Sequence, residues 1–325
     1  MQLITDDAAG CRDTATKINY IKVNGPTADF KSALPGSCLM TAINFTDLSV
    51  SDGTHALTTW NWYYGDGSTA SLNAPPFSHA YANAGNYSVS LMVTDAAGCT
   101  DSIYKNNLLI ISTPVATFTA SDTVSCPLKP ILFTSSSTGP GLQYRWNFGD
   151  GTTSNLMTAS HAYLRDGIYT VQLSITDIYG CTDQVTKLQL IKILTPVAQF
   201  TVSDSAGTCP PLIVQFTNTS VNQSSYNWDF GDGSFSTAIS PSHFYNVAGE
   251  FIARLIITGE GGCTSIQTKK IKIRGPKGSF TYNNFKGCKP LTVNFKATTQ
   301  DRTSFIWDFN DGTTIATSFG ISMTY

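Results

Sequence analysis

Trp228-Asp-Phe-Gly-Asp232-Gly, followed by Ser242-His243-Phe-Tyr245, decides the fold, because this chain of 325 residues repeats both motifs. Copies of the first motif are Trp62-Tyr-Tyr-Gly-Asp66-Gly, Trp146-Asn-Phe-Gly-Asp150-Gly and Trp307-Asp-Phe-Asn-Asp311-Gly. The tryptophans are spaced by 146 − 62 = 84, 228 − 146 = 82 and 307 − 228 = 79 residues. Such regular spacing indicates tandem repeats of about 80–88 residues.

Three further features follow the same period. Ser-His-x-Tyr recurs at His79 and His161, and its fourth copy has Met323 in place of the histidine. Gly-Cys closes the units at Cys11, Cys99, Cys181 and Cys263, and a proline opens them at Pro26, Pro114, Pro196 and Pro276. We therefore divide the chain into residues 1–25, 26–113, 114–195, 196–275 and 276–325.

Hydrophobic residues inside a unit alternate with a period of two. Tyr87-Ser-Val89-Ser-Leu91-Met-Val93 and Tyr169-Thr-Val171-Gln-Leu173-Ser-Ile175 are examples. β-Branched and aromatic residues that alternate with Ser and Thr are typical of half-buried antiparallel strands. About seven such runs fit one unit, so the sequence predicts an all-β fold of tandem Ig-like β-sandwiches without helices.

The composition excludes several classes of function. The formal charge is −2, from 20 basic and 22 acidic residues, and Lys and Arg form no cluster. This argues against a nucleic-acid or anionic-membrane partner. The sequence also has no apolar run of 18 residues, so we expect no membrane-spanning helix.

The ordered motifs, ending in Gly-x-Tyr-x-Val-x-Leu-x-Val-Thr-Asp, resemble the PKD (polycystic kidney disease) domain. The added Gly-Cys and second cysteine resemble the variant in large, gliding-adhesin-like surface proteins of the Bacteroidota that are exported by type IX secretion. The resemblance implies a rod-like array of PKD sandwiches on the cell surface or in a secreted protein. Asn310 and Met323 depart from the motif locally.

The two ends of the chain match parts of a repeat. Residues 1–25 correspond to the last two strands of a preceding PKD domain, and residues 276–325 to the first strands of an incomplete one. We expect an excerpt from a longer tandem array. The alternative is head-to-tail strand complementation, in which residues 1–24 of one chain complete the truncated unit of another.

The repeated tryptophans are predicted to lie in the core. Each has aromatic neighbours two residues before and after, which a strand places on one face. A sandwich needs bulky side chains between its sheets, although an exposed carbohydrate-stacking platform is the alternative. The core residues are Trp62, Trp146, Trp228 and Trp307.

The repeated Asp and His residues suggest structure rather than catalysis. Asp66, Asp150, Asp232 and Asp311 sit in Asp-Gly turns, where calcium would need six to eight oxygen ligands that one aspartate does not supply. His79, His161 and His243 exchange with Met323, which favours packing and hydrogen bonding at a strand end. No catalytic motif is present, so we expect no enzyme activity, cofactor or metal.

The eight cysteines, two per repeat, suggest disulfides in an exported protein. Cys38, Cys126, Cys209 and Cys288 precede the second strand at one pole of a sandwich, and the Gly-Cys hairpins lie at the other. The poles are roughly 25 Å apart, whereas a disulfide needs Cα atoms within about 7 Å. We favour Cys38–Cys181 and Cys126–Cys263 between neighbouring repeats, with Cys11, Cys99, Cys209 and Cys288 paired outside the segment. Bridges within a repeat, such as Cys38–Cys99, and free thiols are alternatives.

Asp-Ser/Thr-apolar triplets, similar to the O-glycosylation consensus of the Bacteroidota, recur beside the cysteine-bearing loops. The candidate residues are Thr14, Ser102, Thr123 and Ser205, with unmodified loop residues as the alternative.

These observations predict a non-catalytic, stiff stalk in an extracellular surface adhesin or fibre. Its partners would be other repeats of the same long chain or neighbouring subunits of a fibre, with a surface polysaccharide or protein ligand also considered. The alternatives are an array of carbohydrate- or protein-binding modules and the accessory region of a secreted hydrolase.

Overall fold

The computed structural model describes residues 1–18, 23–275, 279–283, 286–298, 306–310, 312, 314–316 and 320–324. The backbone divides into two compact bodies. The first consists of Met1–Thr119, Phe133–Ala159 and Val171–Lys187, and it contains the whole first sandwich. The second consists of Ala120–Leu132, Ser160–Thr170 and Leu188–Tyr325, and it contains the whole third sandwich. The described residues contain strands but no helix, which confirms the all-β prediction. None of the described residues forms a helix that could cross a membrane.

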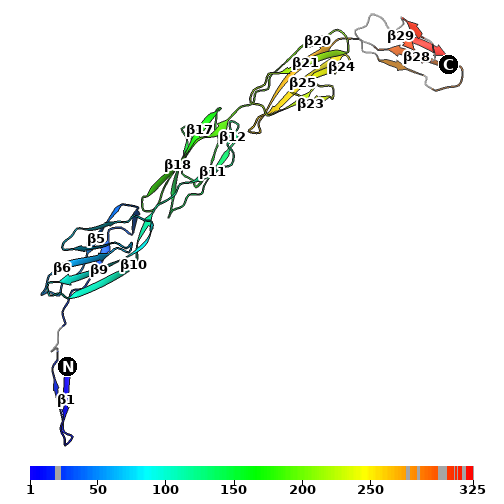
Figure 1. The fold of residues 1–325 in the computed structure, drawn as a ribbon. Helices are drawn as coiled ribbons and strands as arrows, with labels where there is room; N and C mark the ends of the chain where they lie inside the picture. Colours follow the sequence, from blue (N-terminus) through cyan, green and yellow to red (C-terminus); the bar gives the residue numbers. More distant parts are fainter. Residues whose placement is uncertain are drawn as a thin grey trace. The chain divides into compact units, whose positions relative to one another are not determined.

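The first sandwich has a three-stranded and a five-stranded sheet (Figure 1). The three-stranded sheet has the order β3-β5-β8, and the five-stranded sheet has the order β4-β10-β9-β6-β7. The strands are β3 (Phe30–Ser32), β4 (Gly36–Cys38), β5 (Ala42–Asp47), β6 (Leu57–Tyr63), β7 (Thr69–Leu72), β8 (Phe77–Ala80), β9 (Gly85–Asp95) and β10 (Thr100–Ser112).

The alternation in the sequence fills the space between these sheets. Ile43 and Phe45 of β5 point inward from one sheet, and Val89, Leu91 and Val93 of β9 point inward from the other. All five side chains are buried, while the intervening residues are more exposed. Because side chains on a strand alternate between faces, the period of two produces one apolar face per sheet.

The third sandwich repeats this arrangement. Its sheets have the orders β19-β21-β24 and β20-β26-β25-β22-β23. The strands are β19 (Phe200–Val202), β20 (Ala206–Gly207), β21 (Leu212–Asn218), β22 (Ser225–Asp229), β23 (Phe235–Ser236), β24 (Ser242–Tyr245), β25 (Gly249–Thr258) and β26 (Thr264–Ile273).

The second repeat has the same two sheets, in the orders β11-β13-β16 and β12-β18-β17-β14-β15. The strands are β11 (Phe118–Ala120), β12 (Val124–Ser125), β13 (Ile131–Ser135), β14 (Gln143–Asn147), β15 (Thr153–Ser154), β16 (Thr158–His161), β17 (Gly167–Thr176) and β18 (Thr182–Ile193).

The end segments contain fewer strands. β1 (Gln2–Asp6) and β2 (Arg12–Thr16) form an antiparallel hairpin. The last segment forms a three-stranded sheet β27-β28-β31 and a pair β29-β30. Pro276 and Asp311, which the sequence analysis named, lie outside the described residues. The strands are β27 (Phe280–Tyr282), β28 (Thr292–Ala297), β29 (Ile306–Asp308), β30 (Thr314–Ala316) and β31 (Gly320–Thr324).

The Gly-Asp-Gly turn needs each glycine for a different reason. A Cβ on Gly231 would lie 2.7 Å from the backbone nitrogen and oxygen of Ile252, so only glycine allows this close approach. Gly233 has open space around it but a φ of 93°, which L side chains rarely adopt. The motif therefore fixes the hairpin that follows the tryptophan strand, which is β6, β14 or β22 in the three complete repeats.

Short parallel strands were not predicted from the sequence. β4 pairs in parallel with β10, β12 with β18 and β20 with β26. The β4 pairing sets Cys38 opposite Ser112, at the end of the long strand β10. Pairs of two or three residues are too short to give a periodic signal, but they position the first cysteine of each repeat.

Candidate functional site

All four repeated tryptophans are buried. Trp62, Trp146 and Trp228 are 0% exposed and Trp307 is 9% exposed. The indole nitrogens of Trp146 and Trp228 donate to the carbonyls of Leu156 (2.7 Å) and Ala238 (2.9 Å). These rings therefore fill the cores and offer no face to a sugar.

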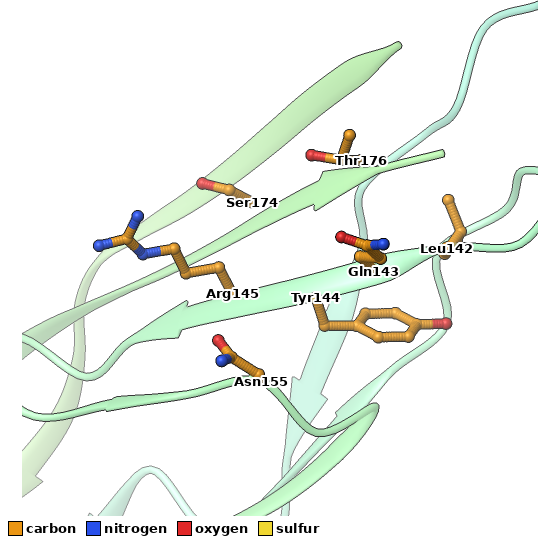
Figure 2. Close-up of a pocket in the computed structure, with 7 residues that line it drawn as sticks. All are labelled: Leu142, Gln143, Tyr144, Arg145, Asn155, Ser174 and Thr176. Atoms are coloured by element: carbon orange, nitrogen blue, oxygen red, sulfur yellow. The ribbon is translucent and has the colours of Figure 1, made fainter. Parts of the chain in front are cut away.

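An open groove of about 680 Å³ lies beside β14 (Figure 2). Its lining is polar and contains one charged side chain, that of Arg145, with no Cys, His, Asp or Glu. Such a set can form hydrogen bonds and neutralise an anion, but it contains no nucleophile with an adjacent base. The lining residues are Leu142, Gln143, Tyr144, Arg145, Asn155, Ser174 and Thr176.

The repeated Asp and His side chains are hydrogen-bonded to each other beneath the turn. His79 Nε2 lies 2.7 Å from Asp66 Oδ2, and its ring stacks on Tyr64 with centroids 4.1 Å apart. His243 and Asp232 repeat this pair at 2.7 Å. Burial alone would raise the pKa of Asp66, but hydrogen bonds from Ser68 and His79 outweigh it, so the pKa is lowered.

A buried tyrosine completes this network. The Tyr245 hydroxyl donates to the carbonyl of Phe230 (2.9 Å), and that of Tyr81 to the carbonyl of Tyr64 (3.1 Å). Asp150 and His161 hold the matching positions of the second repeat. The network ties the turn to the last strand of the three-stranded sheet. It is a structural arrangement, because its polar atoms bond to each other.

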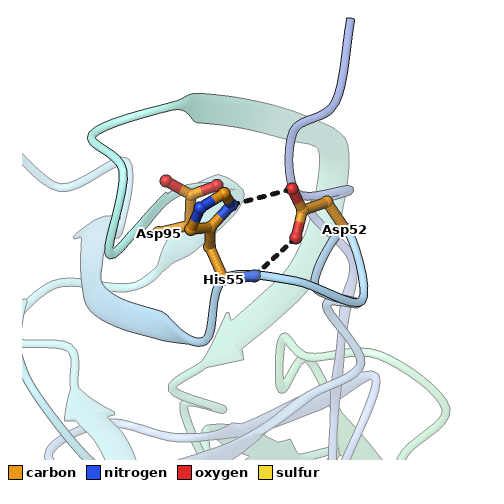
Figure 3. Close-up of side chains that lie close together, drawn as sticks. All are labelled: Asp52, His55 and Asp95. Atoms are coloured by element: carbon orange, nitrogen blue, oxygen red, sulfur yellow. Dashed lines mark hydrogen bonds and ion pairs between the residues drawn. The ribbon is translucent and has the colours of Figure 1, made fainter. Parts of the chain in front are cut away.

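Asp52, His55 and Asp95 form a cluster that the sequence analysis did not identify (Figure 3). Their ligand atoms lie within 4.8 Å of one another. Asp52 Oδ1 accepts the backbone N–H groups of Thr54 and His55, both at 2.7 Å, and Asp52 Oδ2 lies 3.0 Å from His55 Nδ1. No motif spacing signalled this cluster, because 40 residues separate His55 from Asp95.

The cluster gives no evidence for a metal. The Oδ2 atom of Asp95 is buried without a hydrogen-bond partner among the described residues, which a cation would explain. However, Asp177 Oδ2 is orphaned in the same way in the second repeat, where the matching loop, residues 135–142, contains neither His nor Asp. The unpaired Oδ2 atom is therefore a common feature of the turn that Asp95 and Asp177 each form in their own repeat, and it needs no metal to explain it.

That turn presents the Gly-Cys cysteine. Asp177 Oδ1 accepts the backbone N–H groups of Tyr179 and Cys181, each at 2.9 Å. Asp95 does the same for Ala97 and Cys99. An aspartate that caps amides two and four residues ahead closes the hairpin tightly.

Cys181 is joined to Cys38 of the preceding repeat, with Cα atoms 5.3 Å apart. A Cβ on Gly36 would lie 2.6 Å from the Tyr179 ring, so the hairpin packs directly against β4. The bridge therefore connects two repeats and is not the within-repeat pair Cys38–Cys99.

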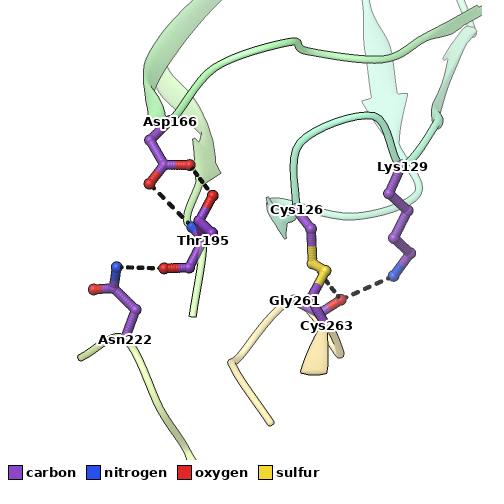
Figure 4. The surroundings of a disulfide bond; sticks show 7 residues. All are labelled: Cys126, Lys129, Asp166, Thr195, Asn222, Gly261 and Cys263. Atoms are coloured by element: carbon purple, nitrogen blue, oxygen red, sulfur yellow. Dashed lines mark hydrogen bonds between the residues drawn. A yellow bond between two sulfur atoms is a disulfide. The ribbon is translucent and has the colours of Figure 1, made fainter. Parts of the chain in front are cut away.

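Cys126 and Cys263 form the equivalent bridge between the second and third repeats, with Cα atoms 6.2 Å apart (Figure 4). Lys129 Nζ donates to the Gly261 carbonyl at 3.0 Å. A Cβ on Gly261 would lie 2.7 Å from the backbone carbon of Ser125, so this hairpin also packs closely against β12.

The linker before Pro196 is held from both repeats (Figure 4). Thr195 donates its hydroxyl to Asp166 Oδ1 (2.6 Å) and its N–H to Asp166 Oδ2 (3.1 Å). The carbonyl of Thr195 accepts the side-chain amide of Asn222 (2.9 Å). Asp166 belongs to the second repeat and Asn222 to the third, so the linker backbone is restrained on both sides.

The other predicted residues lie on the surface. Cys11, Cys99, Cys209 and Cys288 are exposed and unbridged within the described chain. All four modification candidates are exposed. Thr14 and Ser102 lie within strands that begin directly after Cys11 and Cys99, and they pair with Ile4 and Met92. Thr123 and Ser205 lie in loops.

Known proteins are similar to parts of this chain. A family model for the PKD domain matches residues 25–108, 111–192 and 194–273. Collagenase ColA of Bacillus cereus is 47% identical over 47 residues, which are 14% of this chain and 5% of the collagenase. Collagenase ColA of Clostridium perfringens is 42% identical over 48 residues, 15% of this chain and 4% of that protein. The chain thus spans only a small fraction of these curated relatives.

Among solved structures, the PKD1 domain of the Vibrio cholerae metalloprotease PrtV is 31% identical, with a TM-score of 0.22. The match covers 25% of this chain and 100% of that domain. The PKD1 domain of Vibrio anguillarum Epp is also 31% identical, with a TM-score of 0.23, and covers 26% of this chain and 98% of that domain. With most of its residues matched by the family model, the chain belongs to the PKD domain family and carries three PKD domains in tandem.

Proposed function

We propose that this chain is a non-catalytic, mechanical segment of an extracellular surface protein or fibre, in which disulfides fasten each PKD domain to the next. The observation that carries the proposal is the repeated bridge between neighbouring repeats, Cys38–Cys181 and Cys126–Cys263. Disulfides persist in oxidising compartments, which supports an extracellular location. The restrained linker at Thr195 supports a stiff junction.

The bridges would carry tension past an opened sandwich. Interfaces between domains in one chain are usually small, so a short linker alone leaves neighbouring domains free to swing. A covalent bond across the junction removes that freedom. This suits a stalk under shear, such as an adhesin of the Bacteroidota type, exported by type IX secretion.

Peptide mapping of the natively exported protein without reductant tests the proposal. We expect Cys38 linked to Cys181 and Cys126 linked to Cys263. Small-angle scattering should then show greater flexibility after reduction, while the domains stay folded. A Cys99→Ser, Cys209→Ser variant is the matched control, because these thiols form neither bridge. A Cys38–Cys99 peptide would contradict the pairing and the proposed rigidity.

The exposed cysteines extend the same scheme. We propose that Cys11 and Cys99 bond to repeats upstream, and Cys209 and Cys288 to repeats downstream, in a longer chain or fibre.

Glycans at Thr14, Ser102, Thr123 or Ser205 would raise the intact mass of the exported protein above its sequence mass. Unmodified peptides over all four residues would exclude this modification.

The collagenase matches favour one further candidate, the accessory region of a secreted hydrolase. The full gene sequence distinguishes the two functions. A catalytic domain in the same reading frame would favour the hydrolase, whereas a long run of further cysteine-bearing repeats would favour the stalk.

A further inference from the structure

The outer edge of the tryptophan strand is covered to a different extent in each repeat. In the first, β7 pairs with β6 over four residues, from Trp60↔Leu72 to Tyr63↔Thr69. In the second, β15 pairs with β14 only at Trp146↔Ser154 and Asn147↔Thr153. The inner edge of β14 pairs with β17 over all five residues. Among the described residues, no strand therefore pairs with the outer edge of residues 143–145.

The uncovered backbone groups belong to Tyr144. In the turn, the Phe148 N–H donates a hydrogen bond to the Thr152 carbonyl (3.3 Å), which shows which residues direct their backbone N–H and C=O groups to this edge. In an antiparallel ladder these are alternate residues, namely Phe148, Trp146 and Tyr144. Tyr144 corresponds to Trp60, which pairs with Leu72 in the first repeat.

The chain after β15 does not close this edge. The Leu156 carbonyl accepts the indole N–H of Trp146 (2.7 Å), and the Leu156 N–H lies 3.3 Å from Ser154 Oγ. Both backbone groups of Leu156 are thus used locally, at the position where Leu72 pairs in the first repeat. The amide and carbonyl of Tyr144 stay available to an added strand.

The groove of about 680 Å³ lies at this edge (Figure 2). Gln143 and Arg145 stand opposite Thr176 and Ser174 of β17, so their side chains share one face of the sheet. Arg145 is exposed, and it forms no ion pair within the described chain. A free guanidinium among hydroxyl and amide groups is suited to a carboxylate.

We propose that the uncovered edge of β14 binds an extended, acidic peptide segment of a partner protein. The segment adds as a strand beside Tyr144 and places a carboxylate on Arg145. A strand partner satisfies the open amide and carbonyl, which gives affinity, and the charge gives specificity. A peptide fits better than a glycan, because the only aromatic ring in the lining, that of Tyr144, is half-buried.

The other repeats provide internal controls. In the first repeat, β7 covers the outer edge of β6. In the third, β23 pairs with β22 only at Trp228↔Ser236 and Asp229↔Phe235, so its edge is also open, but Asn227 takes the place of Arg145. Among the three complete repeats, which the structure describes, only the second combines the open edge with a cation at this position.

The test uses the full chain and three capped peptides: Thr-Val-Thr-Glu-Thr-Val-Thr, its Gln counterpart, and the Glu peptide N-methylated at the Thr residues flanking Glu. We expect the Glu peptide to shift the amide NMR signals of Tyr144 and Arg145. The Gln peptide should bind roughly tenfold more weakly, the loss expected for one charge-assisted bond. N-methylation removes the ladder donors and should abolish binding.

Arg145→Gln should weaken binding of the Glu peptide about tenfold and leave the Gln peptide unchanged. Because Arg145 is exposed, this variant should keep the wild-type spectrum elsewhere. Asn227→Arg should create a second site in the third repeat. The proposal is wrong if the Glu peptide does not bind at millimolar concentration, or if N-methylation has no effect. It is also wrong if oligogalacturonate replaces the peptide as the ligand, or if the edge pairs with a second copy of this chain.

Discussion

The hydroxyl of Tyr81 reaches across the first sandwich to the carbonyl of Tyr64, and Tyr245 makes the same bond in the third. Burial raises the pKa of Tyr81 and of Tyr245, with smaller contributions from nearby acidic groups, above all Asp66 and Asp232. Both tyrosines therefore stay protonated donors far into the alkaline range. At the scale of single residues, the tyrosine of the Ser-His-x-Tyr motif therefore stabilises the Asp-Gly turn.

Tyr81→Phe should lower the free energy of unfolding of the first sandwich by about 1–3 kcal/mol, because the buried carbonyl of Tyr64 loses its donor. Urea unfolding followed by tryptophan fluorescence measures the change. Tyr104→Phe is the control, since Tyr104 is 66% exposed, and it should change stability by less than about 0.5 kcal/mol. Equal effects of the two variants would contradict the role given to Tyr81.

The pair formed by Asp52 and His55 should depend on pH. The hydrogen bond that the Asp52 carboxylate accepts from the His55 ring raises the pKa of His55, and the hydrogen bonds donated by His55 and Thr54 lower the pKa of Asp52. The contribution of His55 to stability is present below its unfolded pKa and is lost as the pH rises through its folded pKa. That of Asp52 is present above its unfolded pKa and is lost as the pH falls through its folded pKa.

Asp52→Asn should return the pKa of His55 towards the ordinary value of about 6.5. An NMR titration of the His55 ring protons measures this shift. Asp204→Asn, in another repeat, should leave the titration of His55 unchanged. A pKa of His55 that does not fall in Asp52→Asn would show that another group controls it.

At the scale of elements, the long strands could be predicted from the sequence and the short ones could not. The alternation in residues 87–93 belongs to β9, and that in residues 169–175 belongs to β17. Parallel strands such as β12, only two residues long, gave no periodic signal. The cluster of Asp52, His55 and Asp95 was also missed, because only folding brings its loops together.

Gly261→Ala should weaken the docking of the hairpin on β12. The added methyl group would lie 2.7 Å from the backbone carbon of Ser125, a contact that backbone movement must relieve. We expect dithiothreitol to reduce Cys126–Cys263 faster than in the wild type, as measured by alkylation and mass spectrometry. Gly85→Ala, whose methyl group would meet only the Tyr87 ring at 3.6 Å, should not change this rate.

At the scale of the whole molecule, the two bridges close large loops. Cys38–Cys181 spans 143 residues and Cys126–Cys263 spans 137. In the chain-entropy model, loops of this size stabilise the folded state by about 5 kcal/mol each. The cores of the first and third sandwiches lie within single repeats, so they do not need the bridges to form.

Reduction should therefore lower the unfolding temperature without unfolding the protein at 25 °C. Differential scanning calorimetry with and without reductant measures the shift, and far-UV circular dichroism checks that the strands persist. The Cys99→Ser, Cys209→Ser variant should respond to reductant as the wild type does. Loss of the β-sheet spectrum at 25 °C on reduction would show that the sandwiches depend on their bridges.

The two loops overlap, because residues 126–181 belong to both. Were every sandwich pulled open, the backbone from Cys38 to Cys263 would contain 263 − 38 = 225 residues, an extended contour of roughly 750 Å. With both bridges closed, the shortest covalent route crosses from Cys38 to Cys181, runs back to Cys126 and crosses again to Cys263. That route contains only 181 − 126 = 55 residues, or roughly 190 Å. Overlapping bridges thus limit how far this part of the chain can lengthen before a covalent bond breaks.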